Sequence, residues 1–303
     1  MRANKTVTIL WALSSLGVSA ANADVSVVTS IKPVHSLVSG VMQGVGSPTV
    51  IIEGAGSPHT YSLKPSQAKQ LQDADLVFWM GDELEPFLRG PIQNIAKNAK
   101  SIKLIEARGL KKIKFREGGM FDEHDDHGHG EYDPHVWLDP INAKAIVHEI
   151  EEALVKADPK NAKEYKANAD RIAGELDQLV KELRAQFQPV QQKGFIVFHD
   201  AYQYFEQRFG VSAIGSITVS PEVMPGAERV SELRNKIRDL KATCVFSEPQ
   251  FEPKLVRTLV EGTGARAGVL DPLGASLTKG PNLYFQLVRE MARSLKECLS
   301  AKS

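Results

Sequence analysis

The sequence predicts an α/β protein of two similar lobes, each with a mainly parallel sheet, joined by one long rigid α-helix. Three observations support this fold class. Short runs rich in β-branched residues alternate with longer helical patterns in both halves, which is typical of parallel sheets. A helical stretch without Pro lies between the halves. Finally, 303 residues, of which 42% are apolar, suffice for about two domains with buried cores.

The expected elements alternate regularly in each half. In the first half the strands are 25–31, 49–53, 75–81 and 101–107, and the helices are 33–42, 65–74 and 84–99. In the second half the strands are 195–198, 213–219, 243–247 and 267–270, and the helices are 201–209, 228–240, 254–261 and 282–299. Open α/β sheets bind ligands at the carboxyl ends of their strands, so a site is expected in the cleft between the lobes.

The segment between the halves is predicted to be helical and stiff. Residues 142–156 form one helix, which Asp158-Pro159 ends, and residues 160–187 continue without a Pro. About 28 residues at 1.5 Å each give a rod of roughly 42 Å. The alternative is an ordinary surface helix of one lobe. The expected domains are a leader at 1–23, an N-terminal lobe at 24–157, a linking helix at 158–190 and a C-terminal lobe at 191–303.

Residues 1–23 have the layout of a secretory signal peptide. Arg2 and Lys5 precede an apolar run, and Ala21-Asn22-Ala23 forms a small-residue cleavage site. The alternative is an uncleaved membrane anchor. The leader predicts an exported protein, and the balance of 37 basic against 37 acidic residues predicts no nucleic-acid partner and no attraction to a membrane surface.

The two cysteines, Cys244 and Cys298, are expected to form one structural disulfide. Cys244 lies in a predicted buried strand, and Cys298 lies near the end of an amphipathic helix that can pack over it. Disulfides persist in the oxidising compartments that exported proteins reach. The alternative is two free buried thiols. Both cysteines have apolar neighbours, so neither is expected to bind a metal.

An unusual segment spans residues 115–132. It is acidic and Gly-rich, it has almost no aliphatic residues, and it contains His124, His127 and His129. Such a composition predicts a mobile, solvated loop, and its imidazoles predict weak accessory metal binding. The alternative is a charged insertion in which the histidines occur by chance.

Three further histidines and one aspartate lie at, or near, the carboxyl ends of predicted strands. They are His59, His135, His199 and Asp271, and each comes from a different part of the chain. If the two sheets face each other, these side chains converge on the cleft. Three neutral imidazoles with at most one carboxylate form a ligand set that Zn²⁺ accepts, whereas Mn²⁺ and Mg²⁺ prefer more oxygen.

Four strings around these residues resemble a known family. They are 57–66 (SPHTYSLKPS), 133–140 (DPHVWLDP), 198–202 (FHDAY) and 270–274 (LDPLG). With the leader and the long helix, they are similar to the metal-specific (cluster A-I, or cluster 9) solute-binding proteins of ABC importers, and among these to the periplasmic zinc receptors. The match covers nearly the whole mature chain. A His-rich charged loop before the second ligand is typical of the zinc group.

The resemblance implies that His59, His135 and His199 are the metal ligands. His199 distinguishes the zinc group, because manganese and iron relatives usually carry Glu at this place. Some zinc members carry Glu directly before the first ligand, where this chain has Pro58. The fourth ligand is therefore either Asp271 or a water. Asp133, Asp139 and Asp200 are candidates to accept the outer imidazole proton, or are turn formers and helix caps.

The same resemblance implies the function. It implies a periplasmic, monomeric receptor that is not an enzyme and that delivers Zn²⁺ to a membrane permease with its cytoplasmic ATPase. Three alternatives remain: a manganese or iron receptor of the same family, an exported zinc hydrolase, and a surface adhesin or metal buffer. A hydrolase needs an open coordination position with a general base beside it. Neither a His-Glu-x-x-His string nor a Gly-x-Ser-x-Gly string occurs in the sequence.

Overall fold

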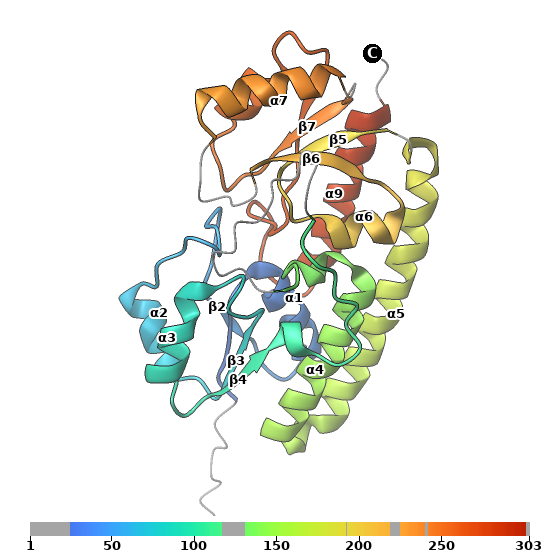
Figure 1. The fold of residues 1–303 in the computed structure, drawn as a ribbon. Coiled ribbons are helices and arrows are strands. Elements are labelled where there is room, and N and C mark those ends of the chain that lie inside the picture. Colours follow the sequence, from blue (N-terminus) through green and yellow to red (C-terminus); the bar gives the residue numbers. More distant parts are fainter. Residues whose placement is uncertain (1–24, 117–130, 192, 219–224, 240–241, 301–303) are drawn as a thin grey trace, which may run out of the picture.

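The computed structural model describes residues 25–116, 131–191, 193–218, 225–239 and 242–300. The predicted leader and most of the predicted loop, including His124, His127 and His129, lie outside these residues. Figure 1 shows two lobes, one above the other, with α5 running along one side of both. Among the described residues no helix has the length and apolar character needed to cross a membrane.

Each lobe is built on a four-stranded parallel sheet, and the two sheets have the same strand order. The N-terminal sheet has the order β2-β1-β3-β4, and the C-terminal sheet has the order β6-β5-β7-β8. The strands are β1 (Val27–Thr29), β2 (Thr49–Val50), β3 (Leu76–Trp79), β4 (Lys100–Lys103), β5 (Phe195–His199), β6 (Ala213–Thr218), β7 (Cys244–Ser247) and β8 (Arg266–Val269). The predicted fold class is thereby confirmed.

Helices connect the parallel strands, because such strands cannot be joined by a tight turn. The described helices are α1 (Lys32–Val41), α2 (Pro65–Gln72), α3 (Pro86–Asn94), α4 (Pro140–Ala157), α5 (Ala162–Phe187), α6 (Gln203–Phe209), α7 (Ala227–Asp239), α8 (Lys254–Val260) and α9 (Leu283–Ser300). Of these, α1 to α3 and α6 to α8 connect strands within a sheet, whereas α4 and α5 lie in sequence between the two sheets and α9 follows β8. The third helix is shorter than the predicted 84–99. It begins at Pro86 and contains Pro91, whose ring removes a backbone donor, and it ends at Asn94.

The long helix between the lobes is α5, with 26 residues and therefore a length of about 39 Å. Its apolar stripe, formed by Ile172, Leu176, Leu179 and Leu183, is buried throughout. The stripe faces a core that also contains residues of α1, α4 and α9 and of both sheets, which we call the shared core. The lobes are therefore joined by packed side chains in addition to a covalent link.

A second, smaller cluster fills the far side of the C-terminal sheet, and we call it the outer core. It consists of Ile196, Phe198, Ile217, Leu233, Ile237, Ala242, Val245, Val256 and Leu259. Strand β5 supplies both cores: Phe195 and Val197 enter the shared core, while Ile196 and Phe198 enter the outer core. This division follows from the alternation of side chains along a strand.

The C-terminal end of the chain returns to the N-terminal lobe. The buried Lys32 of α1 donates to the carbonyl oxygens of Gly274, Ala275 and Leu277 at 2.6, 3.0 and 2.6 Å. The backbone N–H of Tyr284 donates to Ser36 Oγ at 2.9 Å. Residues 274–284 thus belong to the C-terminal half in sequence but are bonded to α1. The domain boundaries expected at residues 157 and 190 separate segments of the sequence, but residues from both sides of them belong to the shared core.

The predicted disulfide is present. Cys244 on β7 is bonded to Cys298 on α9, and their Cα atoms are 6.2 Å apart. The bond connects the C-terminal sheet to the helix that packs against α1 and α5.

Candidate metal centre

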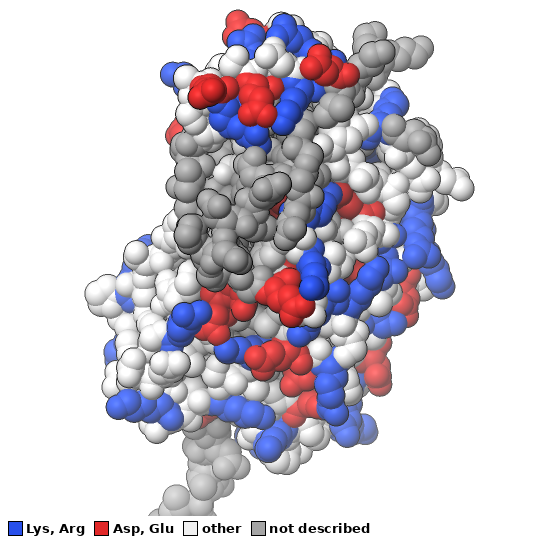
Figure 2. Space-filling model, viewed as in Figure 1, with Lys and Arg blue, Asp and Glu red and all other residues white. Residues whose placement is uncertain are grey.

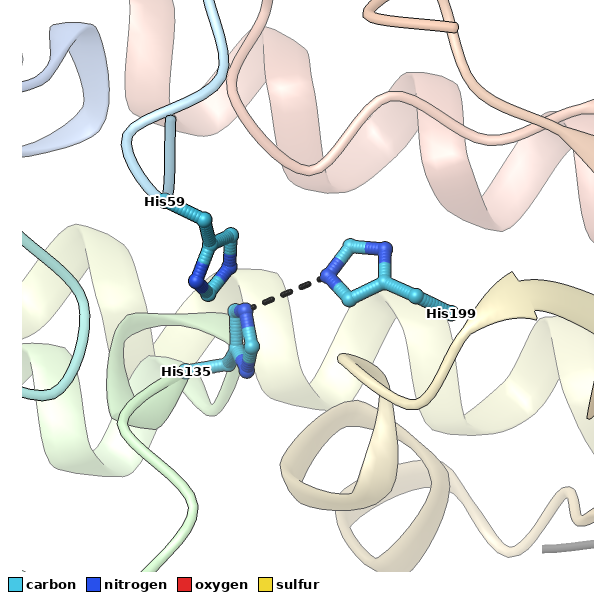
Figure 3. A group of neighbouring side chains, drawn as sticks. All are labelled: His59, His135 and His199. Carbon is cyan, nitrogen blue, oxygen red and sulfur yellow. Dashed lines mark hydrogen bonds between the residues drawn. The ribbon is translucent and has the colours of Figure 1, made fainter. Parts of the chain in front are cut away.

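Three imidazoles from distant parts of the chain meet between the lobes. His59 lies in the loop between β2 and α2, His135 directly precedes the short 3₁₀ helix Val136–Leu138, and His199 is the last residue of β5. Each offers a ring nitrogen, and these atoms all lie within 4.8 Å of one another. Figure 3 shows the three rings pointing toward a common point, with Nε2 of His135 and Nε2 of His199 3.3 Å apart.

The position of His199 follows from the alternation along β5. Residues 195 and 197 direct their side chains into the shared core, and residue 199 has the same parity. The strand therefore ends with an imidazole on the face that looks toward the N-terminal lobe. Because the side chain is at the carboxyl end of a parallel strand, it lies where such sheets place their ligands.

His135 is held by a carboxylate two residues earlier. Asp133 Oδ1 accepts hydrogen bonds from the backbone N–H of His135 at 2.9 Å and from its Nδ1 at 2.7 Å. Nδ1 of His135 therefore carries a proton that it donates to Asp133, and Nε2 of His135 faces the other histidines. Burial, with the neighbouring His199, lowers the pKa of His135 well below its usual value. Burial also raises the pKa of Asp133 to about 7.

His199 has an equivalent support that the sequence analysis missed. Its Nδ1 lies 2.7 Å from Oε1 of Glu248, which is buried directly after β7. Burial lowers the pKa of His199, but the carboxylates of Glu248, Asp200 and Asp133 together outweigh this effect, so the pKa is raised overall. A signal was present, since Glu248 follows a predicted strand end just as Asp271 does. However, Glu248 directly precedes Pro249, and a polar residue at such a place is equally typical of a turn, so the sequence did not single it out.

The three histidines line a small cavity of about 10 Å³, roughly the space of one water molecule or ion. Its walls come from both lobes and are partly apolar, which limits access of bulk solvent. The lining residues are Ser57, Pro58, His59, His135, Trp137, His199, Glu248, Gln250, Phe251, Pro272 and Leu273.

Asp271 is not part of the group formed by the three histidines among the described residues. Its carboxylate accepts from the backbone N–H groups of Leu273, Gly274 and Ala275 at 3.1, 2.9 and 2.6 Å. It also accepts from Nε2 of Gln250 at 3.2 Å. The carboxylate therefore organises the loop that carries Pro272 and Leu273, two lining residues of the cavity.

The two other aspartates considered in the sequence have different partners. Asp139 caps α4 by accepting from the backbone N–H of Ile141, and it pairs with Arg208 at 2.6 Å. Asp200 is paired with Arg116, which also binds Glu206. Asp133 is the candidate that is seen to bond an imidazole, that of His135.

The remaining described histidines are separate from the centre. Nε2 of His35 lies 3.2 Å from the carbonyl oxygen of Pro48. His148 is on the exposed face of α4, beside Glu151 and Glu152. These placements agree with the sequence-based choice of ligands, which left both histidines out.

Comparison with known proteins places the chain in a family. The family model described as "Zinc-uptake complex component A periplasmic" (ZnuA) matches residues 27–298. The "High-affinity zinc uptake system protein ZnuA" of Brucella suis biovar 1 (strain 1330) is 52% identical, and the match covers 94% of each chain. The protein of the same name from Yersinia pestis is 37% identical, covering 91% of this chain and 92% of the relative.

Solved structures give the same result. A structure described as "Crystal structure of ZnuA" superposes with a TM-score of 0.79 at 26% identity, covering 91% of this chain and 100% of the other. A mutant of the laminin-binding adhesin Lmb from Streptococcus agalactiae superposes with a TM-score of 0.77 at 27% identity, covering 91% and 99%. Because the family model spans nearly all of the described chain and curated relatives are up to 52% identical over 94% of it, this chain belongs to the ZnuA family of periplasmic zinc-uptake components.

Proposed function

We propose that this chain captures Zn²⁺ between its lobes through His59, His135 and His199 and delivers it to an ABC-type importer. The observation that carries the proposal is the convergence of three ring nitrogens within 4.8 Å from three separate segments. Zinc takes four ligands in a tetrahedron and readily accepts imidazole nitrogen. The curated relatives are named for high-affinity zinc uptake.

The supporting carboxylates prepare two of the ligands for an ion. Asp133 and Glu248 each accept from the Nδ1 side of a histidine, which turns Nε2 of His135 and Nε2 of His199 toward each other, 3.3 Å apart and in hydrogen-bond contact. Such outer partners fix the ring orientation and raise the basicity of the ligand. The ordering of these two rings is therefore complete before the ion arrives, and little conformational entropy is lost on binding.

For the fourth coordination position we propose a water rather than Asp271. The Asp271 carboxylate already accepts three backbone N–H groups and the Gln250 amide. Moving it to the ion would leave those donors without an acceptor, which costs about 1–3 kcal/mol for each buried donor. A water makes no such demand, because it can bind the ion without taking an acceptor away from these donors.

The partners we propose are a membrane permease and its cytoplasmic ATPase, with the receptor acting as a monomer in the periplasm. The family model describes a periplasmic component of a zinc-uptake complex. On the described part of the face in Figure 2, acidic and basic side chains are interspersed. This distribution favours a protein partner over a polyanion, which would require a continuous basic patch.

Two alternatives are disfavoured by the ligand chemistry. A manganese or iron receptor would need more oxygen ligands, but Asp133 and Glu248 are bonded to the histidines themselves. A zinc hydrolase would need a carboxylate free to act as general base beside the ion. The carboxylates nearest the centre are engaged as described above, and the family is one of solute receptors.

Metal analysis tests the proposal directly. Protein purified without added metal should contain zinc, and zinc should displace manganese in competition titrations. His135→Ala should abolish tight binding, while His148→Ala, which changes an exposed histidine, should leave it intact. A deletion strain should grow poorly only when zinc is scarce. Preference for manganese, or unchanged zinc affinity in His135→Ala, would contradict the proposal.

A further inference from the structure

Besides the histidines, two polar atoms that line the metal cavity have no hydrogen-bond partner among the described residues. They are Oε1 of Gln250 and Oγ of Ser57, and both are buried. Ser57 belongs to the loop of His59 in the N-terminal lobe, and Gln250 follows Glu248 in the C-terminal lobe. Buried polar atoms are almost always paired, so two such atoms at one cavity call for an explanation.

The orientation of the Gln250 side chain is set by Asp271. Its Nε2 donates to Oδ1 of Asp271 at 3.2 Å. A carboxylate offers only acceptors, so the amide nitrogen must face Asp271 and the amide oxygen must face the other way. Asp271 is in turn fixed by the backbone N–H groups of its own loop. Hydrogen bonds thus connect the loop at residues 273–275 to Asp271 and Asp271 to Gln250, and Oε1 of Gln250 is the acceptor that remains at the cavity.

We propose that Gln250 Oε1 and Ser57 Oγ accept the two protons of the water that completes zinc coordination, which makes Gln250 and Ser57 positioning residues of the site. This inference rests on the proposed function and deepens it. A zinc-bound water has two protons to donate, and the cavity offers two acceptors without other partners. With the ion as its third partner, the water has the usual number of contacts for a buried water.

The arrangement gives Asp271 a role without direct coordination. It acts on the ion through Gln250, as outer partners act through ligands elsewhere. It also makes the site depend on both lobes, because Ser57 and Gln250 reach the same water from opposite sides. A neutral water can leave with the ion, whereas a bound carboxylate would first have to be separated from it.

Zinc affinity in four variants tests the positioning role. Gln250→Leu should bind Zn²⁺ about 10- to 100-fold more weakly, as is usual for outer partners. Ser57→Ala should have a smaller effect, and the double variant should lose less than the product of the two, because both changes affect one water. Gln191→Leu is the matched control, since Gln191 bonds the carbonyl oxygen of Phe209 away from the cavity. It should bind zinc like the parent protein.

Azide binding to the Co²⁺-loaded protein separates this role from a structural one. Azide can replace a bound water but cannot donate to Gln250, so the parent protein should bind it weakly. Gln250→Leu removes the acceptor and should bind azide about two- to tenfold more tightly, the worth of one hydrogen bond. If Gln250→Leu does not fold, Gln250→Met takes its place. The azide titration of the parent protein needs no variant and still tests whether the fourth ligand is an exchangeable water.

The outcomes distinguish this inference from the proposed function. If His135→Ala keeps tight zinc binding, the proposed site is wrong. If His135→Ala loses binding while Gln250→Leu matches the parent in zinc and azide affinity, the site stands and the inference is overturned. A cobalt spectrum that never responds to azide would also overturn it, because the fourth ligand would not be an exchangeable water.

Discussion

The two lobes hold their buried histidines of the candidate centre on similar supports but anchor these supports differently. In the N-terminal lobe, His135 and its carboxylate Asp133 are two residues apart in one segment, beside Trp137 of the shared core. In the C-terminal lobe, His199 ends β5, Glu248 follows the neighbouring strand β7, and the two residues are 49 residues apart. The first pair is a local turn, whereas the second depends on the register of a whole sheet.

The difference also appears in the protonation of the two rings. The pKa of His135 is lowered well below its usual value by burial and by His199, while the pKa of His199 is raised by Glu248 despite its burial. Two imidazoles in one cavity therefore respond differently to acid. His199 is therefore the more easily protonated of the two rings, and its position depends more on tertiary structure than that of His135.

The largest expected effect is the loss of either imidazole. His135→Ala and His199→Ala should each weaken zinc binding by more than about 100-fold, because even outer partners of ligands are worth 10- to 100-fold. Chelator-competition titrations would measure both. A much larger effect at one histidine would show that the lobes contribute unequally.

Removal of the disulfide tests the anchoring of the C-terminal ligand. Cys298→Ser should lower the free energy of unfolding by about 2–4 kcal/mol, since the bond closes a loop of 54 residues. Denaturant unfolding would measure this change. The bond holds β7, which directly precedes Glu248, so zinc affinity should fall as well. Unchanged stability together with two free thiols in mass spectra of the parent protein would refute the pairing.

Neutral replacements of the supporting carboxylates sharpen the comparison. Asp133→Asn and Glu248→Gln keep an acceptor oxygen but lose the charge, so each should weaken zinc binding by about tenfold. Isothermal calorimetry at neutral pH would give both values. The comparison would fail if only Asp133→Asn had an effect, because Glu248 would then be a bystander.

Acidification should act through His199 first. Since a protonated ring cannot bind zinc, affinity should fall by up to about tenfold per pH unit once the pH is below the raised pKa of His199. The stability of the zinc-free protein should change with pH in the opposite direction. The raised pKa stabilises the fold in acid, and this contribution is lost as the pH rises through that pKa. Glu248→Gln should shift the fall in affinity to lower pH, and an unshifted profile would contradict the assignment.

The smallest effect is expected for the loop. Deleting residues 117–130, which include His124, His127 and His129, should leave the tight site unchanged and remove only weak additional metal binding. Fixing a Gly-rich segment around an ion costs about 1–2 kcal/mol per residue, which keeps such sites weak. Loss of the tight site in a titration of the deletion variant would show that a loop histidine is a core ligand.

Much of this molecule could be predicted from its sequence because its signals are local. Alternating apolar runs identified both sheets, and four strings that resemble a known family pointed to His59, His135 and His199, which lie together in the structure. Features that depend on side-chain direction escaped. Asp133 and Asp139 occur in the same string, yet one supports His135 and the other caps α4. Likewise, Gln250 and Glu248 look like turn residues until the sheet register places them at the cavity.

The bonds between α1 and residues 274–284 have a consequence for the order of events during biogenesis. Lys32 and Gly274 are 242 residues apart, and Ser36 and Tyr284 are 248 apart. The first helix therefore cannot complete its contacts until nearly all of the chain has been synthesised. Contacts between such distant residues slow folding. For a chain predicted to be exported, it follows that the leading half alone cannot reach its final form, because its first helix lacks these partners until residues 274–284 are available.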